Sequence, residues 1–179
     1  SQGTGDADAS ERAAELVVDG ADGTVNITEL TADVHAEDFG GALTLTTVGF
    51  EATGGVSGTG TGAENNPALE LVTGSGPTTI NGADSDNSNA DDGQVVDISV
   101  DASAMAAPEG TQETLTLNGD AEYRVINNGT GVITLDIESI GDDNKLFLEG
   151  TGDFELTNTQ ADIDASALSG KVTVRTLDE

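Results

Sequence analysis

Short runs in which every second residue is apolar recur along the chain, separated by Gly, Asp and Asn. Leu43-Thr44-Leu45 and Val172-Thr173-Val174 are typical. Period-two alternation predicts β-strands that bury one face, and the residues between the runs predict turns. Helical periodicity is poor, and only single turns are expected, at 9–15, 36–40 and 102–107. Strands are expected at 15–19, 24–28, 42–47, 68–72, 95–100, 113–118, 122–126, 131–137, 145–149, 153–157 and 171–176.

A longer phrase also repeats: an acidic triplet followed by an alternating apolar stretch. Residues 32–47 align with 161–176 without a gap, and the preceding segments 16–20 and 146–150 also correspond. The positions at which the triplets begin fit a repeat of about 25–35 residues, with insertions in places. Such repetition is more typical of a scaffold or a surface layer than of a small enzyme.

These patterns predict a single all-β domain over 1–179, folded as a parallel β-solenoid or irregular β-helix with Gly/Asp-rich loops. The loops are expected at 52–66 and 81–94. Repeat-like units are expected at about 8–50, 68–118, 113–141 and 145–179.

The charge of the chain is strongly unbalanced, with 34 acidic and 5 basic residues and a net charge of −29. Self-repulsion of this size destabilises a compact state unless cations screen or bind the carboxylates. Nucleic acid and anionic membranes are excluded as partners because both need clustered Lys and Arg. No apolar stretch is long enough for membrane insertion. Two cationic environments remain: bound divalent metal, or a salty external medium. Because the chain has no cysteine for disulfides, a secreted chain of this kind needs another staple, and calcium is a common one.

The acidic stretch 81–93 is the best metal candidate. Calcium takes six to eight oxygen ligands, and Asp-x-Asp-x-Ser spacing can curl several side chains around one ion. The stretch departs from an EF-hand because Asn89 and Val95 occupy the Gly and Glu positions. The alternative interpretation is a solvated acidic loop. The candidate ligands here are Asp84, Asp86, Ser88, Asp91 and Asp92.

Further acidic residues occur at expected turns between strands. Carboxylates stacked along a solenoid could share calcium ions between coils, which would relieve the repulsion. Each single corner is equally explained by turn chemistry, since Asp, Asn and Gly are favoured there without metal. We expect at least one calcium in the chain. The corner candidates are Asp19, Asp22, Asp120, Asp142, Asp143 and Asp153.

Catalytic patterns are weak. His35 is the only histidine, and its aligned partner is Asp164, so His35 is interpreted as a variant of a structural position. The glycine-rich run 54–62 is not followed by Gly-Lys-Ser/Thr and is not a phosphate loop. A polysaccharide lyase would need a basic residue beside the sugar acid, and Arg124 or Lys145 would have to serve. We therefore expect that the protein is not an enzyme.

Residues 146–157 followed by 163–174 resemble the strand repeats of secreted S-layer and adhesin-like proteins of Gram-negative bacteria, many of them exported by type I secretion. The resemblance implies a calcium-stabilised β-solenoid, a cell-surface location and a role in assembly or adhesion. The Gly-Gly-x-Gly-x-Asp nonapeptide of RTX calcium rolls is absent, and its nearest match is 150–153. The RTX ligand scheme is therefore not carried over.

The expected function is structural: a self-assembling unit of an S-layer, filament or adhesin stalk, with itself and calcium as partners and a cell-surface glycan as a further one. The final copy, 172–176, leaves a strand edge open, which favours pairing with another chain. The alternative is a calcium-dependent carbohydrate- or ligand-binding β-module of a secreted protein. The lack of Trp and the single Tyr count against that alternative.

Overall fold

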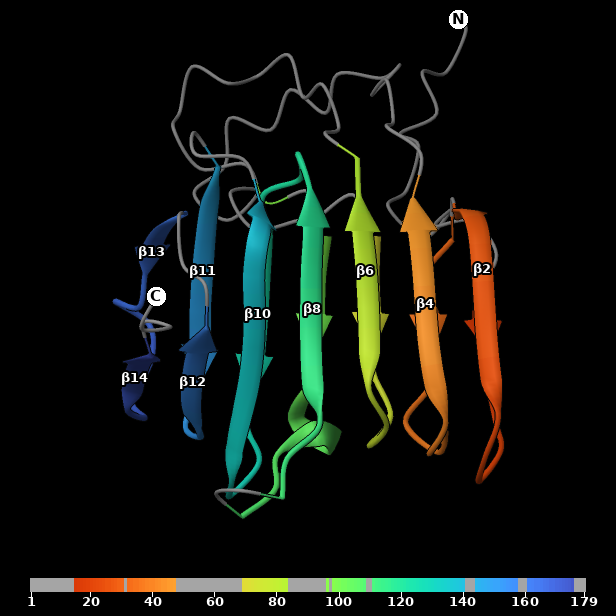
Figure 1. Cartoon of the computed structure of the whole chain (residues 1–179), viewed down its shortest axis with the longest axis horizontal. Coiled ribbons are helices and arrows are strands. Elements are labelled where there is room, and N and C mark those ends of the chain that lie inside the picture. Colours follow the sequence, from red (N-terminus) through yellow and green to blue (C-terminus); the bar gives the residue numbers. More distant parts are fainter. Residues whose placement is uncertain are drawn as a thin grey trace, which may run out of the picture.

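Two sheets of seven strands each make up the protein, and every pairing between named strands is parallel. Figure 1 shows one sheet in front of the other, with β2 and β14 at opposite ends. The all-β prediction and the parallel pairing are confirmed. The computed structural model describes residues 15–30, 32–47, 69–83, 96, 98–108, 111–140, 144–157 and 161–175.

The odd-numbered strands form one sheet, here the odd sheet, and the even-numbered strands form the other, the even sheet. In spatial order, the odd sheet contains β1 (Leu16–Val17), β3 (Val34–His35), β5 (Leu69–Val72), β7 (Ile98–Asp101), β9 (Tyr123–Asn127), β11 (Lys145–Gly150) and β13 (Asp162–Asp164). The even sheet contains β14 (Val172–Arg175), β12 (Asp153–Thr157), β10 (Val132–Ile140), β8 (Thr114–Gly119), β6 (Thr78–Gly82), β4 (Ala42–Thr47) and β2 (Thr24–Leu30).

Each of the eleven expected strands overlaps an observed one, and the expected turn at 102–107 contains the 3₁₀ turn η2 (Ser103–Met105). Sequence reasoning missed three strands: β3, β6 and β13. Strands β3 and β13 are too short to show an alternation, and β6 is mostly polar. They are extended because their neighbours on both sides, or on one side for β13, supply backbone partners.

Successive strands belong to opposite sheets, and each strand pairs with the strand two places further along the chain. Leu16 of β1 pairs with Val34 of β3, which is 18 residues on. Leu43 of β4 pairs with Thr78 of β6, which is 35 residues on. The shortest repeat is therefore shorter than the predicted one of about 25–35 residues. The longer value includes the inserted segments.

The alignment of the N-terminal and C-terminal copies is visible in the backbone pairing. Gly20 forms a bridge with Phe39, and Gly150 forms the same kind of bridge with Leu168, the residue aligned with Phe39. Likewise, Leu146 pairs with Ile163 as Leu16 pairs with Val34. The equivalence that the sequence predicted between these segments is confirmed.

The core lies between the two sheets and is built of stacked aliphatic side chains. In the even sheet Leu45 pairs with Ile80, which pairs with Leu117, and all three are buried. Full burial of one such side chain stabilises the fold by about 1.5–3 kcal/mol. Phe39, Phe154 and Tyr123 are the buried aromatic residues of the described core.

Two corner glycines are required by the close approach of neighbouring backbones. Gly119 at the end of β8 has φ +95°, and Gly150 at the end of β11 has φ +108°. A Cβ on Gly119 would lie 2.1 Å from the carbonyl oxygen of Gly82, and one on Gly150 would lie 2.2 Å from that of Asn127. The strand-then-glycine phrase of the sequence thus marks where the chain leaves one sheet.

Tyr123 links the two sheets through its hydroxyl group. The side chain begins on β9 of the odd sheet and is fully buried. Its oxygen accepts a hydrogen bond from the N–H of Gly82 at 2.8 Å and donates one to the carbonyl of Asn118 at 2.7 Å, both in the even sheet. Removing the hydroxyl would leave buried backbone groups without this partner.

We predict that Tyr123→Phe lowers the free energy of unfolding by about 1–3 kcal/mol, because two buried polar groups lose a hydrogen bond and no apolar surface is gained. Urea unfolding followed by circular dichroism measures the change. Thr173→Val is the matched control, since it removes a hydroxyl from the half-buried outer position of β14. Equal losses of stability in Tyr123→Phe and Thr173→Val would contradict the role assigned to the Tyr123 hydroxyl.

Candidate functional site

The predicted acidic corners are at the surface where the structure describes them. Asp19 and Asp22 are exposed between β1 and β2, and Asp120 is exposed between β8 and β9. Asp153 begins β12, and its Oδ1 accepts a hydrogen bond from the backbone N–H of Lys171 at 2.8 Å. The other predicted ligands, Asp84, Asp86, Ser88, Asp91, Asp92, Asp142 and Asp143, lie outside the described residues.

Within the described ranges, no three His, Cys, Asp or Glu side chains are grouped so that they could hold a metal ion. The described corner aspartates are therefore not brought together into a carboxylate-rich calcium site of the kind expected from the sequence. Calcium binding stays a prediction that rests on the acidic stretch 81–93.

Two of the acidic triplets form local turns at the ends of odd-sheet strands. Asp101 Oδ1 accepts a hydrogen bond from the N–H of Ser103 at 3.0 Å, and Asp164 Oδ1 accepts one from the N–H of Ser166 at 2.9 Å. Hydrogen bonds from the side chain and the backbone of Ser166 hold the pKa of the Asp164 carboxyl below its usual value. At these two positions the triplet turns the chain, whereas the triplet that begins at Asp136 lies within β10.

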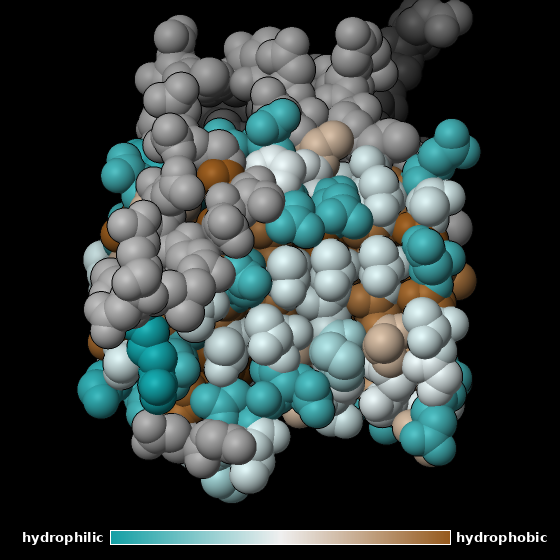
Figure 2. All heavy atoms as spheres, in the orientation of Figure 1, coloured by the Kyte–Doolittle hydropathy of each residue, from teal (hydrophilic) through white to brown (hydrophobic). Residues whose placement is uncertain are grey.

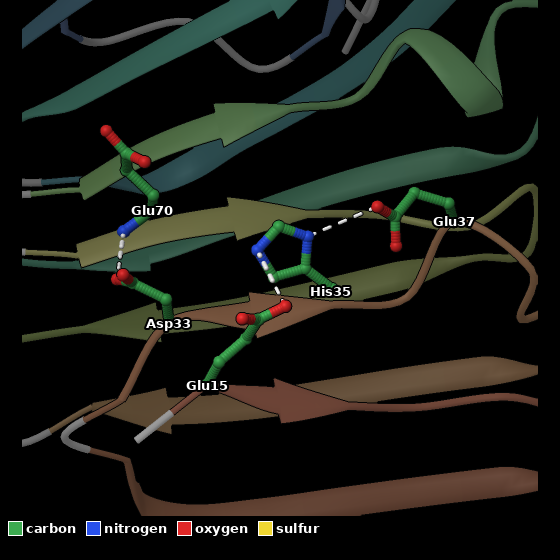
Figure 3. Close-up of polar contacts among 5 residues, drawn as sticks. All are labelled: Glu15, Asp33, His35, Glu37 and Glu70. Atoms are coloured by element: carbon green, nitrogen blue, oxygen red, sulfur yellow. Dashed lines mark hydrogen bonds and ion pairs between the residues drawn. The ribbon is translucent and has the colours of Figure 1, made fainter. Parts of the chain in front are cut away.

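His35 occupies the same slot as Asp164, as the alignment predicts. His35 pairs with Val17 in the odd sheet, and Asp164 pairs with the equivalent Phe147. In Figure 3 the imidazole lies between two carboxylates: Nδ1 is 3.2 Å from Glu37 Oε1, and Nε2 is 3.6 Å from Glu15 Oε1. The ring therefore connects the segment before β1 to the turn after β3.

A second contact extends this cluster to β5. The Oδ1 atom of Asp33 accepts a hydrogen bond from the N–H of Glu70 at 2.9 Å (Figure 3). His35, Glu15, Asp33, Glu37 and Glu70 thus join three neighbouring strands of the odd sheet, and four of these five residues are acidic. The cluster concentrates negative charge around the chain's single histidine.

The hydrogen bond to Glu37 is the main reason that the pKa of His35 is raised, with further contributions from the charges of Glu15, Glu37 and Asp33 against an opposing effect of burial. The pKa of Glu37 is lowered, mainly by a backbone hydrogen bond and then by His35. Stability from His35 is present below its unfolded pKa and is lost as pH rises through the folded one. Stability from Glu37 is lost as pH falls through its lowered pKa. Both contributions coexist at about pH 4.5–6.5.

We predict that the His35 ring titrates above its ordinary pKa of about 6.5. Its single ring resonance in an NMR titration measures this directly. Glu37→Gln should lower the midpoint more than Glu15→Gln, because the bond to Glu37 is the largest cause. Glu149→Gln, on β11, is the control and should leave the midpoint unchanged. A titration midpoint that neither Glu15→Gln nor Glu37→Gln changes would contradict the assigned contacts of His35.

The two ends of the sheets are the most distinctive exposed features of the described chain. Among the described residues, β1 and β2 at one end, and β13 and β14 at the other, pair with a strand on one side only. The exposed large hydrophobic side chains are on these end strands: Leu16 and Val17 on β1 are 38% and 58% exposed, and Val174 on β14 is 52% exposed. Leu16 pairs with buried Val34, and Val174 pairs with buried Leu156, so these two side chains continue core rows to the ends of the described sheets. Val17 instead pairs with His35 on the outer side of the odd sheet.

The charges of the two ends differ. Residues 15–30 at the first end carry Glu15, Asp19, Asp22 and Glu29 and no basic residue. Residues 161–175 at the other end carry Asp162 and Asp164 but also Lys171 and Arg175, so their charge is balanced. Nε of Arg175 lies 2.7 Å from Oε1 of Glu155. One described end is therefore acidic and the other is neutral.

Comparisons with family models, with curated proteins and with solved structures gave no match. Among the described residues, no helix is long and apolar enough to cross a membrane. A hollow beside Phe147, Glu149 and Asp164 has a volume of about 190 Å³. This hollow is smaller than most ligand pockets, which measure about 300–1,000 Å³. The exposed surfaces of the sheets are therefore the stronger candidates for a function.

Proposed function

We propose that the protein is a structural, self-assembling unit of an extracellular layer, filament or adhesin stalk, folded as a β-solenoid. Each coil of this solenoid contributes one strand to each sheet. The alternation of successive strands between two parallel sheets supports the solenoid. The internal repeat and the acidic composition support a scaffold role in a salty external medium.

The observation that carries the proposal is that, among the described residues, each sheet ends in strands paired on one side only, where Leu16 and Val174 of the core rows are exposed. An open edge presents unpaired backbone N–H and C=O groups that another chain can pair with. If β1 and β2 of one copy add beside β13 and β14 of another, the new pairs are parallel, as they are within the chain. Because the two joined surfaces differ, this contact can repeat without closing and builds a filament.

Electrostatics favour this head-to-tail arrangement over the symmetric one. Joining two acidic ends would bring eight described carboxylates together, four from residues 15–30 of each copy. Joining the acidic end to the balanced end places Lys171 and Arg175 near those carboxylates. Because the net charge is −29, assembly should be stronger when salt screens the long-range repulsion.

Two substitutions that each block one end test the proposal. Leu16→Glu should block the acidic end, and Val174→Glu should block the balanced end, because each puts a charge in a core row exposed at that end. Neither variant should form filaments alone. Mixed together, they should form heterodimers through the two intact ends. Light scattering after size exclusion measures the masses, starting from a monomer of 18.0 kDa, and negative-stain microscopy detects filaments of the unaltered chain.

Thr134→Glu is the matched control, because it adds the same charge to the outer face of β10, away from both ends. This variant should assemble like the unaltered chain. Dimers of Leu16→Glu or Val174→Glu alone would indicate symmetric contacts and contradict head-to-tail assembly. A chain that stays monomeric at all salt and protein concentrations would overturn the proposed function.

Calcium is proposed as a stabilising partner, and specific binding can be separated from screening. We predict that excess chelator lowers the melting temperature and that calcium restores it at constant ionic strength. Asp84→Asn combined with Asp86→Asn should reduce the calcium response, whereas Asp19→Asn should preserve it. Equal responses to calcium and to sodium chloride of matched ionic strength would show that only screening operates.

A further inference from the structure

The outer face of the even sheet carries regular rows of uncharged polar side chains. Thr44 of β4 pairs with Thr79 of β6, which pairs with Thr116 of β8. Two residues further along the same strands, Thr46, Asn81 and Asn118 form a parallel row. We call these six residues the neutral face. All six are half-buried by their neighbours, as side chains in packed rows are.

Strand geometry fixes the spacing of the neutral face in two directions. Neighbouring strands lie about 4.7–4.9 Å apart, and alternate residues of a parallel strand lie about 6.6 Å apart. A hydroxyl or an amide group therefore recurs at constant intervals across three strands. Unlike a loop, this array keeps its spacing through the backbone ladder beneath it.

Hydrogen bonds along one row hold its side chains in place. Nδ2 of Asn118 donates to Oδ1 of Asn81 at 3.0 Å, and Nδ2 of Asn81 donates to Oγ1 of Thr46 at 3.2 Å. The threonines of the other row are β-branched, which restricts their χ1 rotation. A surface whose side chains are already ordered loses little entropy when it binds a rigid partner.

The neutral face is free of charge in a chain of net charge −29. The row of Thr116 becomes charged beyond β8, because Thr116 pairs with Asp136 of β10 and, further along the same row, Thr157 of β12 pairs with Arg175 of β14. In the adjacent row, Thr134 of β10 pairs with Glu155 of β12. Figure 2 shows pale side chains in rows across the middle of this face. The even sheet thus has a neutral part over β4, β6 and β8 and a charged part over β10, β12 and β14.

We propose that the neutral face binds ice, a crystalline partner made of ordered water. Such a lattice is recognised by hydroxyl and amide groups at regular intervals, with methyl groups between them and without charges that would impose their own hydration shells. The six residues of the neutral face supply the hydroxyl and amide groups, and the sheet sets their regular spacing. None of the six side chains is charged. A polysaccharide would be expected to stack on aromatic rings, and the six positions hold none.

The test compares lysine substitutions on the two parts of the sheet in the full chain. Thr79→Lys and Thr116→Lys place a bulky charge in the neutral face, and Thr134→Lys and Thr173→Lys add the same charge to the charged part. We expect the unaltered chain to shape ice crystals and to separate their melting and freezing points in nanolitre osmometry. The first two variants should lose this effect, and the two controls should keep it.

Circular dichroism melts establish that each variant is folded. If the lysine variants unfold, Thr79→Val with Thr116→Val removes both hydroxyls while keeping the shape, and should weaken the effect. Absence of ice shaping by the unaltered chain would overturn the proposal, as would equal losses in all four lysine variants. Binding of Thr79-dependent polysaccharide without any effect on ice, or a dimer that only Thr79→Lys disrupts, would assign the face to those partners instead.

Discussion

The structure depends on one constraint: each strand pairs in parallel register with the strand two places further along the chain. Register places like positions on like positions, so that Leu45, Ile80 and Leu117 stack in one buried row. An inward position on one strand must then be apolar on the next strand of the same sheet, and a corner must leave room for its neighbour's backbone. Segment length between strands is far less constrained, since steps of 18 and 35 residues both return to register.

This constraint explains which parts of the fold could be predicted from the sequence. The alternation at 42–47 and 153–157 is strong because one face of each strand is buried, and both strands are where the pattern placed them. The gapless alignment located equivalent coils because register demands equivalent residues. Strand β3 could not be predicted, since two extended residues have no periodicity of their own. The predicted repeat of about 25–35 residues lies within the observed steps, which run from 17 residues between Leu146 and Ile163 to 37 between Thr78 and Leu115.

The features of the candidate surfaces likewise divide into those that the sequence predicted and those that only the structure shows. The alignment placed His35 in the slot of Asp164, and the pairing with Val17 and Phe147 bears this out. Glu15 was not associated with the histidine beforehand, because this contact depends on β1 and β3 being neighbours. The neutral face could not be predicted from the sequence either, because it depends on which strands are neighbours. Thr44 and Thr79 are 35 residues apart, and only the register places them side by side.

Charge accounts for how the two proposed activities can share one molecule. The proposed assembly uses the ends, where burying Leu16 and Val174 is favourable and the acidic end meets the balanced one. Ice binding uses the side of the even sheet, which such contacts leave open. Seven strands spaced about 4.8 Å apart give an axial repeat of roughly 34 Å. A head-to-tail stack would therefore present the neutral face periodically, alternating with the charged strands β10, β12 and β14. The charged intervals would keep neighbouring filaments apart, while each neutral interval stays accessible to a flat, uncharged lattice.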